Sequence, residues 1–327
     1  MTKALALISG GLDSILAAKL VKDQGIEVIG ICFKSYFFGA KSAEKMTKQI
    51  GVPLEVVDFS DEHLEIVKSP KHGHGKNMNP CIDCHAMMMK EAGKLLDKYN
   101  ADFIITGEVL NQRPMSQNKS SLNVVKKESG IGEKILRPLC AKVLPETEME
   151  KEGLIDRNNL LGISGRGRKV QMELAEKWGI KDYPSPAGGC KLTEPNYSIR
   201  LRELLEHVEN PSERELELLK YGRHFRVSEG CKVISSRTAV EADEIRKLVN
   251  DQDIGFLVKD FKGSMVIIDG ESSDKDIEFA AKVAGRYSKG KDEEKIKVIY
   301  GEYAKPYNKS IEVKPASDDE IAEFIIS

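Results

Sequence analysis

Two stretches of this 327-residue chain combine residue types and spacing that suit chemistry. The first covers residues 9–14, with the sequence SGGLDS, between an apolar run of strand type and apolar residues at helical spacing. Two adjacent glycines let backbone amides approach a ligand closely, and the N-terminus of the following helix favours an anion. Hydroxyls of Ser9 and Ser14 and the carboxylate of Asp13 predict a loop that holds phosphate, with Asp13 available to Mg²⁺. The alternative is a tight strand-to-helix turn without a ligand.

Three of the six cysteines form the second candidate set. Cys81 and Cys84 open a predicted helix over 81–99, so both sulfurs lie on one face, and the helix N-terminus is expected to lower thiol pKa. Cys190 follows a proline- and glycine-rich loop at 184–189. The CxxC pair alone fits half a zinc site, a redox pair or an iron–sulfur site. Because no second CxxC completes a zinc site, three cysteines favour a [4Fe–4S] cluster with one iron free of protein ligands. The remaining cysteines are predicted to be buried small hydrophobes: Cys32, Cys140 and Cys231.

Alternating strands and helices must position these residues over the first part of the chain. The predicted strands cover residues 4–8, 27–33, 54–58, 101–108 and 135–139, and the predicted helices residues 15–21, 41–50, 61–68, 81–99, 111–130, 147–153 and 170–178. This alternation predicts an α/β domain built on a parallel sheet with both faces covered. Ligands of such sheets bind beyond the carboxyl ends of the strands, where the 9–14 loop, Phe33 and Gly107 fall. Phe33 is predicted as a wall for adenine, with core packing as the alternative, and Gly107 as a close approach for ATP.

The residue patterns divide the chain into three parts. Residues 1–195 are predicted to form the nucleotide-binding domain, 196–220 a charged helical connector, and 221–327 a smaller α+β domain with one strand over 225–235. Within the first part, residues 163–169 form a basic, glycine-rich loop that enters a helix. Its cations are predicted to contact RNA backbone, with a solvated helix entry as the alternative. The predicted RNA-binding residues are Arg166, Arg168 and Lys169.

Composition narrows the class of protein. The formal net charge is −2, so a global basic field is missing and nucleic acid must bind through a local patch. No apolar run approaches membrane-spanning length, and the first residues do not have the pattern of a signal peptide. We therefore expect a cytoplasmic protein that does not engage a membrane, and six cysteines in that compartment argue for metal or catalytic use rather than disulfides.

The SGGLDS loop, the CxxC pair and the distant cysteine together resemble the PP-loop ATP pyrophosphatases that thiolate tRNA, over residues 1 to about 195. The match is MnmA-like at VIG (28–30), at the NP before the CxxC pair, and at TG (106–107). In that family ATP is cleaved between its α- and β-phosphates and a uridine oxygen is adenylated. The resemblance then implies a persulfide on Cys190, with Cys84 acting in release. The extra Cys81 makes the set similar to TtcA and TtuA as well, whose three cysteines hold a [4Fe–4S] cluster with a free iron that binds sulfide.

The chain also departs from these relatives. Glu108 stands where MnmA-like chains usually have histidine, no THUMP domain precedes the loop as in ThiI, and TtuA-like zinc ribbons are missing. The C-terminal part does not resemble the MnmA barrel, and its residues 286–289 are similar to the NFACT-R family of RNA-associated domains.

The resemblance therefore implies an ATP-dependent tRNA uridine sulfurtransferase with ATP, Mg²⁺ and a [4Fe–4S] cluster. Both 4-thiouridine and 2-thiouridine are left open as products, and the missing barrel favours the former. The expected partners are tRNA and a sulfur donor, either sulfide or a cysteine desulfurase, and a homodimer is left open. The resemblance implies that Asp13, Cys84 and Cys190 are catalytic. It implies that the cluster ligands are Cys81, Cys84 and Cys190. The implied cofactor-binding residues are Ser9, Gly10, Gly11, Asp13, Ser14, Phe33 and Gly107.

Three alternatives remain at this point. A cluster-free thiolase would use persulfide chemistry on Cys84 and Cys190 alone. Another PP-loop reaction, such as amide formation from ammonia, would leave the three spaced cysteines unexplained. A non-enzymatic RNA-binding protein stabilised by zinc would show no ATP pyrophosphatase activity and would tolerate loss of Asp13.

Overall fold

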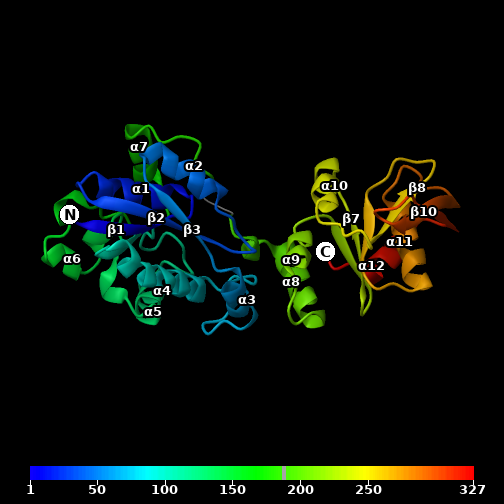
Figure 1. Cartoon of the computed structure of the whole chain (residues 1–327), viewed down its shortest axis with the longest axis horizontal. Helices are drawn as coiled ribbons and strands as arrows, with labels where there is room; N and C mark the ends of the chain where they lie inside the picture. Colours follow the sequence, from blue (N-terminus) through cyan, green and yellow to red (C-terminus); the bar gives the residue numbers. More distant parts are fainter. Residues whose placement is uncertain (186–188) are drawn as a thin grey trace. The chain divides into compact units, whose positions relative to one another are not determined.

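The computed structural model describes residues 1–185 and 189–327, which form two compact units, Met1–Thr193 and Glu194–Ser327 (Figure 1). Part of the predicted loop before Cys190, residues 186–188, lies outside the described residues. Within the described ranges no helix combines the length and the apolar character that crossing a membrane requires.

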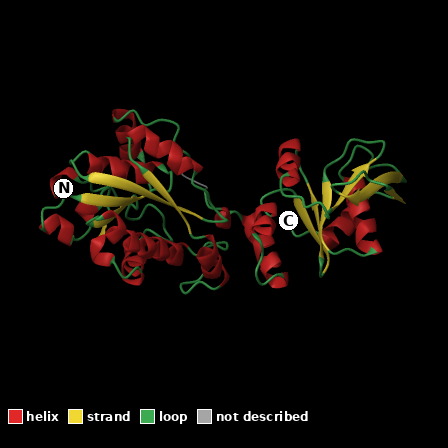
Figure 2. Ribbon diagram, viewed as in Figure 1, coloured by secondary structure: helices red, strands yellow, loops and turns green. Residues whose placement is uncertain are grey.

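The first unit is a parallel five-stranded sheet with helices on both faces (Figure 2), which confirms the predicted α/β class. The strand order is β3-β2-β1-β4-β5. The strands are β1 (Lys3–Leu7), β2 (Glu27–Lys34), β3 (Leu54–Asp58), β4 (Phe103–Thr106) and β5 (Ile135–Leu136). The helices are α1 (Leu12–Lys22), α2 (Lys41–Ile50), α3 (Ser60–Lys68), α4 (Cys81–Tyr99), α5 (Lys119–Glu128), α6 (Glu148–Lys151) and α7 (Lys169–Lys177).

Strand β1 is the centre of this sheet. Its side chains alternate, so that Ala4 and Ala6 pack in one core with α1, α2 and α7, while Leu5 packs in the opposite core with α4 (Figure 1). The strand pairs with β2 on one side and with β4 on the other. After β1 the chain adds β2 and β3 on one side of this strand and then crosses to its other side, where it adds β4 and β5. The carboxyl end of β1 is therefore the topological switch point, where doubly wound sheets bind ligands.

Two predicted elements of this unit are shorter than expected. The helix predicted over 111–130 is confined to α5, because Pro114 interrupts the earlier residues and Asn118 caps the helix by accepting a hydrogen bond from the Ser121 amide at 2.9 Å. The strand predicted over 135–139 is confined to β5, two residues before Pro138.

The second unit is an antiparallel sheet of order β11-β10-β8-β9-β7-β6 with helices, which confirms the predicted α+β class. Its strands are β6 (Arg223–Ser228), β7 (Cys231–Ser235), β8 (Ile254–Val258), β9 (Val266–Gly270), β10 (Ile296–Glu302) and β11 (Lys309–Val313). Its helices are α8 (Pro195–His207), α9 (Glu213–Leu218), α10 (Ala239–Arg246), α11 (Asp274–Arg286) and α12 (Asp318–Phe324).

The single strand predicted over 225–235 was wrong. The segment is a hairpin, because the chain turns at Glu229-Gly230 and pairs β6 with β7. The predicted connector, residues 196–220, forms α8 and α9 and belongs to the second unit. Arg200 of α8 is buried and donates to the Leu219 carbonyl at 2.9 Å, which ties the two helices together.

Candidate functional site

The 9–14 loop has a backbone that only glycine can adopt at its centre. Gly10 has φ of +78°, and a Cβ there would lie 2.6 Å from the Ala43 amide nitrogen. The Ser42 hydroxyl donates to the Gly10 carbonyl at 3.1 Å, so the start of α2 holds the loop in place. The loop is thereby shaped by close backbone packing, with Gly11 as the N-cap of α1.

A second glycine brings the end of β4 against this loop. A Cβ on Gly107 would lie 2.4 Å from the Ser14 amide nitrogen, so only glycine allows the two segments to touch. The Ser14 hydroxyl donates to the Gly11 carbonyl at 2.8 Å and lies 3.5 Å from the Ser9 hydroxyl. The predicted phosphate-binding residues therefore form one compact group, while the role of Gly107 towards ATP stays a prediction.

The carboxylate of Asp13 is held from one side only. Gln112 donates to Oδ2 at 2.6 Å, and the buried Gln171 of α7 in turn donates to Gln112 Oε1 at 2.9 Å. Oδ1 is buried, and no described group hydrogen-bonds to it. A buried carboxylate oxygen without a partner fits a role as ligand to Mg²⁺, which proteins bind through one or two carboxylates together with substrate phosphates.

Sequence reasoning missed Gln112 and Gln171. Gln112 follows Gly107 by five residues and so reaches the same sheet edge, which is the only signal that could have pointed to it. Nothing in the spacing of α7 distinguishes Gln171 from an ordinary polar helix residue.

Cys81 and Cys84 occupy the first turn of α4, as predicted. Cys81 is half-buried and accepts a hydrogen bond from Asn79 Nδ2 at 3.2 Å, whereas Cys84 is buried. Burial raises the pKa of the Cys84 thiol well above its usual range, and the nearby Cys190 and Cys81 raise it further. The expectation that the helix N-terminus lowers this pKa was therefore wrong, because the loss of solvent outweighs the helix dipole.

The segment with Cys190 is tied to the segment that leads into α4. Asn77 Nδ2 donates to the Thr193 carbonyl at 2.7 Å, and Thr193 Oγ1 donates to the Cys190 carbonyl at 2.8 Å. On the other side, the Lys191 amide donates to the Phe37 carbonyl at 3.1 Å. The fold thus brings together two cysteine-bearing segments that are about a hundred residues apart in sequence.

The thiols of Cys81, Cys84 and Cys190 are the kind of donors that an iron–sulfur cluster needs. In their present positions, however, no three His, Cys, Asp or Glu side chains of the described residues stand close enough together to hold a metal ion. The donor set therefore fits a cluster in its chemistry, and the cluster itself stays a prediction.

A buried cluster of aromatic side chains lies around Phe37, whose carbonyl accepts the hydrogen bond from the segment with Cys190. His63 is fully buried, its Nδ1 lies 2.7 Å from the Ser35 hydroxyl, and its ring stacks on Phe59 with centroids 5.0 Å apart. Phe33 is also buried and packs on Phe59 at 5.1 Å, so its side chain belongs to the core, and its contact with adenine stays a prediction. Burial lowers the pKa of His63 to about 4.

This buried histidine predicts acid sensitivity of the first unit. Because the pKa rises from about 4 in the folded protein to 6.5 when unfolded, the unfolded chain binds the extra proton between these values. The contribution of neutral His63 to the free energy of unfolding is therefore complete above pH 6.5. It falls by about 3 kcal/mol as the pH is lowered to about 4. Denaturant unfolding followed by fluorescence of Trp178, the only tryptophan, measures this difference. His63→Gln should flatten the pH dependence and the exposed-site control His74→Gln should not; equal slopes in all three proteins would refute the assignment.

Glu108 forms a buried charge cluster beside the cysteine helix. Its carboxylate accepts a hydrogen bond from Arg137 Nε at 2.9 Å, and His85 Nδ1, adjacent to Cys84, lies 3.0 Å from its other oxygen. Burial alone would raise the pKa of Glu108, but the Arg137 charge and the hydrogen bonds from His85 and Arg137 outweigh it and lower the pKa to about 2. The residue that departs from the MnmA pattern thus connects the end of β4 to α4.

We expect Glu108→Gln to destabilise the first unit by about 3–5 kcal/mol at neutral pH, because it leaves the Arg137 charge buried without a counter-ion. In the native chain this stabilisation is complete above pH 4.5 and is lost as the pH falls towards 2. Stability is measured by denaturant titration, with the double variant Glu108→Gln/Arg137→Met as the comparison. The double variant should recover part of the loss; additive losses would show that the two side chains act independently.

The basic loop predicted to bind RNA lies at the start of α7. Arg166 and Lys169 are exposed, and Lys169 is loosely paired with Glu173 at 3.9 Å. Arg168 is half-buried, and its Nε is buried without a hydrogen-bond partner among the described residues. Through Gln171 and then Gln112, the same helix is connected to Asp13, so the predicted RNA-binding residues lie at the entry to a helix that supports the phosphate loop.

Two family models match the chain. Residues 1–149 match the thiamine biosynthesis protein (ThiI) family, and residues 222–325 match the NFACT protein RNA binding domain. The two matches fall in the two compact units.

Individual relatives agree with the first match. The chain is 29% identical over 168 residues to a probable tRNA sulfurtransferase of Thermococcus kodakarensis, covering 49% of this chain and 41% of that one. It is 33% identical over 124 residues to the tRNA-specific 2-thiouridylase MnmA of Clostridium acetobutylicum, covering 32% and 35%. The chain therefore spans well under half the length of the curated relatives it matches.

Among solved structures, the U34-tRNA thiolase NcsA from Methanococcus maripaludis with its [4Fe-4S] cluster matches with a TM-score of 0.34 and 17% identity, covering 67% of this chain and 70% of that one. A similarity at this level carries no argument about the site. The sequence matches confirm the resemblance: the first 149 residues are similar to the ThiI family, and the relatives matched are named as tRNA sulfurtransferases and tRNA 2-thiouridylases.

Proposed function

We propose that this protein is an ATP-dependent tRNA thiolase that adenylates a uridine carbonyl oxygen and replaces it with sulfur. One observation carries the proposal. Two consecutive residues at the end of β4 join the two halves of the site, since Gly107 touches the phosphate loop at Ser14 and Glu108 holds His85, the neighbour of Cys84. Activation of the substrate oxygen and delivery of sulfur can therefore take place in one site.

The first step belongs to the 9–14 loop. Backbone amides at the start of α1 and the hydroxyls of Ser9 and Ser14 would bind the pyrophosphate part of ATP, with Mg²⁺ at the free oxygen of Asp13. The uridine carbonyl oxygen attacks the α-phosphorus, the bond to the β-phosphate breaks, and pyrophosphate leaves. The protein's contribution is positioning and charge stabilisation, as in phosphoryl transfer generally.

The second step belongs to the cysteines. A sulfur nucleophile forms a bond to the adenylated carbon, and AMP leaves with the former carbonyl oxygen. A [4Fe–4S] cluster held by Cys81, Cys84 and Cys190 would supply an iron atom with no protein ligand that is open to external sulfide. Without a cluster, a persulfide on Cys190 attacks, and the Cys84 thiolate then cleaves the sulfur–sulfur bond and frees the product as a disulfide forms between the two cysteines.

The partners follow from the same chemistry. The substrate is tRNA, contacted through Arg166, Arg168 and Lys169 and through residues 222–325, which match an RNA-binding domain. Sulfide would be the donor for the cluster route, whereas the persulfide route takes its sulfur from the persulfide of a cysteine desulfurase; 4-thiouridine is favoured over 2-thiouridine as the product. Acting on tRNA, the protein would work in the cytoplasm.

Loss of Cys81 separates the two sulfur routes. Iron and acid-labile sulfide are measured on full-length protein purified without oxygen, for the wild type and for Cys81→Ala, together with thiolation of a tRNA transcript. About four irons and four sulfides per chain, lost together with thiolation in the variant, would establish the cluster. Thiolation without iron, unchanged in Cys81→Ala, would return Cys84 and Cys190 to persulfide chemistry.

A further inference from the structure

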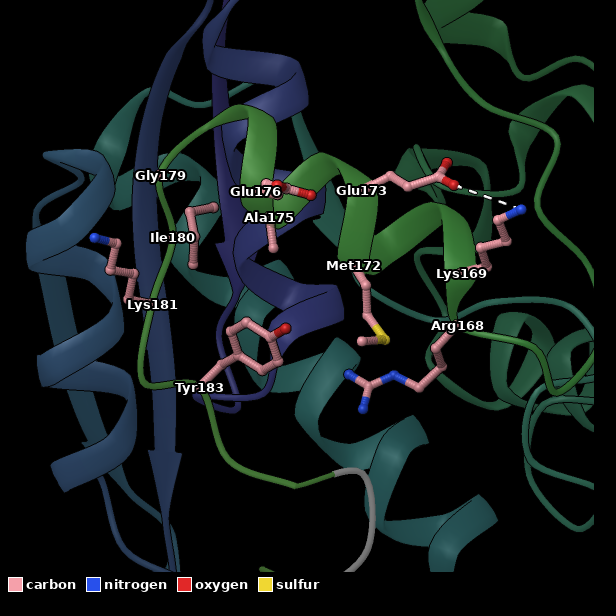
Figure 3. Close-up of a pocket in the computed structure, with 10 residues that line it drawn as sticks. All are labelled: Arg168, Lys169, Met172, Glu173, Ala175, Glu176, Gly179, Ile180, Lys181 and Tyr183. Carbon is pink, nitrogen blue, oxygen red and sulfur yellow. Dashed lines mark ion pairs between the residues drawn. The ribbon is translucent and has the colours of Figure 1, made fainter.

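A cavity of about 640 Å³ lies between α7 and the segment that follows it, residues 179–183. Figure 3 shows the side chains of Arg168, Met172 and Tyr183 converging on this cavity from two separate stretches of chain. Arg168 was predicted from the sequence to contact RNA backbone, whereas the cavity could not be predicted, because only the fold places residues 179–183 opposite α7.

The walls of the cavity are fixed by the rest of the unit. Gln49 of α2 makes two hydrogen bonds to Lys181, accepting from its amide at 2.9 Å and donating to its carbonyl at 2.8 Å. Ala175 and Ile180 are buried in the core and form the floor. These contacts hold the 179–183 segment at a distance from α7. The cavity between the two is therefore a consequence of the fold.

The lining suits a flat, weakly polar ring. Met172 lines the cavity and is 55% exposed, so its thioether is available to a ligand. The Tyr183 ring and the Arg168 guanidinium are planar groups on which an aromatic ring can stack, and a thioether packs well against ring edges. The half-buried Arg168 guanidinium at the edge of the cavity also carries N–H donors for a ring carbonyl or nitrogen.

The charges around the cavity point to a base rather than to a phosphate. Lys169 and Lys181 direct their ammonium groups away from it in Figure 3, and Lys169 is paired with Glu173. Glu176 adds a second carboxylate to the lining. The neighbouring exposed Arg166 is then free to meet the backbone of the same strand outside the cavity.

The cavity shares α7 with a residue that supports the phosphate loop. Arg168 precedes Gln171 by one helical turn, and Gln171 is connected to Asp13 of the phosphate loop through Gln112. A nucleotide bound in the cavity would therefore be a close neighbour of the nucleotide that reacts with ATP.

We propose that this cavity binds an unpaired nucleobase of the RNA substrate, adjacent to the reacting uridine, by stacking it on Tyr183 and Arg168. The inference rests on the proposed function, since it names how the substrate of that site is held. It implies that the enzyme requires the bases around its target to be unstacked and single-stranded.

Binding measurements on the full-length protein test this inference. With a fluorescein-labelled single-stranded oligouridylate as the probe, Tyr183→Ala should weaken binding about tenfold or more, because stacking contributes about 1–3 kcal/mol per base. Tyr183→Phe keeps the ring and should bind as the wild type does. Lys177→Ala removes an exposed cation of the same helix outside the cavity lining and should change affinity much less. Trp178 fluorescence verifies that each variant is folded.

Photocrosslinking identifies the contact directly. A tRNA transcript containing 5-iodouridine should crosslink to Tyr183 or Met172 in the wild type, as located by peptide mass spectrometry. Normal affinity of Tyr183→Ala, or crosslinks confined to residues outside the cavity, would overturn the inference while ATP-dependent thiolation by the wild type still upheld the proposed function. If the wild type neither thiolated tRNA nor bound the probe, both would fail together.

Discussion

Asp13→Asn should reduce ATP-dependent pyrophosphate release by about 10²–10³-fold, because it removes the charge that faces the metal and the phosphates. The variant keeps an oxygen that can accept the hydrogen bond from Gln112, so the loop should fold normally. Release is measured as pyrophosphate formed in the presence of tRNA and sulfide. Sulfur transfer should fall in parallel, since it requires the adenylated uridine.

Two matched variants sharpen this prediction. Asp23→Asn removes an exposed carboxylate at the other end of α1 and should leave pyrophosphate release unchanged. Gln112→Leu releases Asp13 from its only described hydrogen bond, and we expect an intermediate loss of about tenfold. Full pyrophosphate release by Asp13→Asn would show that the Asp13 carboxylate has no role in cleaving ATP.

Cys190→Ala should abolish sulfur incorporation while pyrophosphate release continues, because adenylation does not need a thiol. The expected loss of thiolated product is at least about 10²-fold, as for removal of a group that forms the essential covalent or ligand bond. Thiolation is measured by nucleoside mass spectrometry of digested tRNA, alongside pyrophosphate release on the same samples. This separation of the two steps is expected under both sulfur routes.

The control is Cys32→Ala, which removes a cysteine buried in β2 whose pKa is raised by burial to about 11. That thiol has no role in the proposed chemistry, so the variant should thiolate tRNA once it is folded. Equal loss in both variants would point to instability, and wild-type thiolation by Cys190→Ala would remove Cys190 from the reaction.

Local patterns in the sequence were enough to predict most helices and strands of the first unit. Residues 9–14 lie between consecutive elements, so strand, glycine turn and helix could be predicted from neighbours along the chain, as could the start of α4 at Cys81. The parallel sheet could be predicted from the alternation of strands and helices, whereas its strand order came from the structure. The hairpin at 223–235 was missed because a two-residue turn interrupts only briefly a stretch that otherwise has the residues of a strand.

Long-range contacts account for what sequence reasoning could not find. The connection from Asp13 through Gln112 to Gln171 joins residues up to 158 positions apart, and amides at such distances leave no periodic signal. The raised pKa of Cys84 likewise depends on burial by the whole unit, which outweighs the local helix dipole. The candidate reactive groups could be predicted from the sequence, whereas the contacts that support them and their electrostatics required the fold.

The central claim is that ATP cleavage at the 9–14 loop and sulfur transfer at the cysteines act on one uridine. The most direct test is nucleoside mass spectrometry of an unmodified tRNA transcript after anaerobic incubation with the full-length protein, ATP and Mg²⁺, in one sample with sulfide and in a second with a cysteine desulfurase, cysteine and a dithiol reductant. We predict one uridine per tRNA in which sulfur has replaced oxygen, with pyrophosphate and AMP formed in equal amount and no product without ATP. Unchanged nucleosides, with intact binding of the tRNA and of ATP, would contradict the claim.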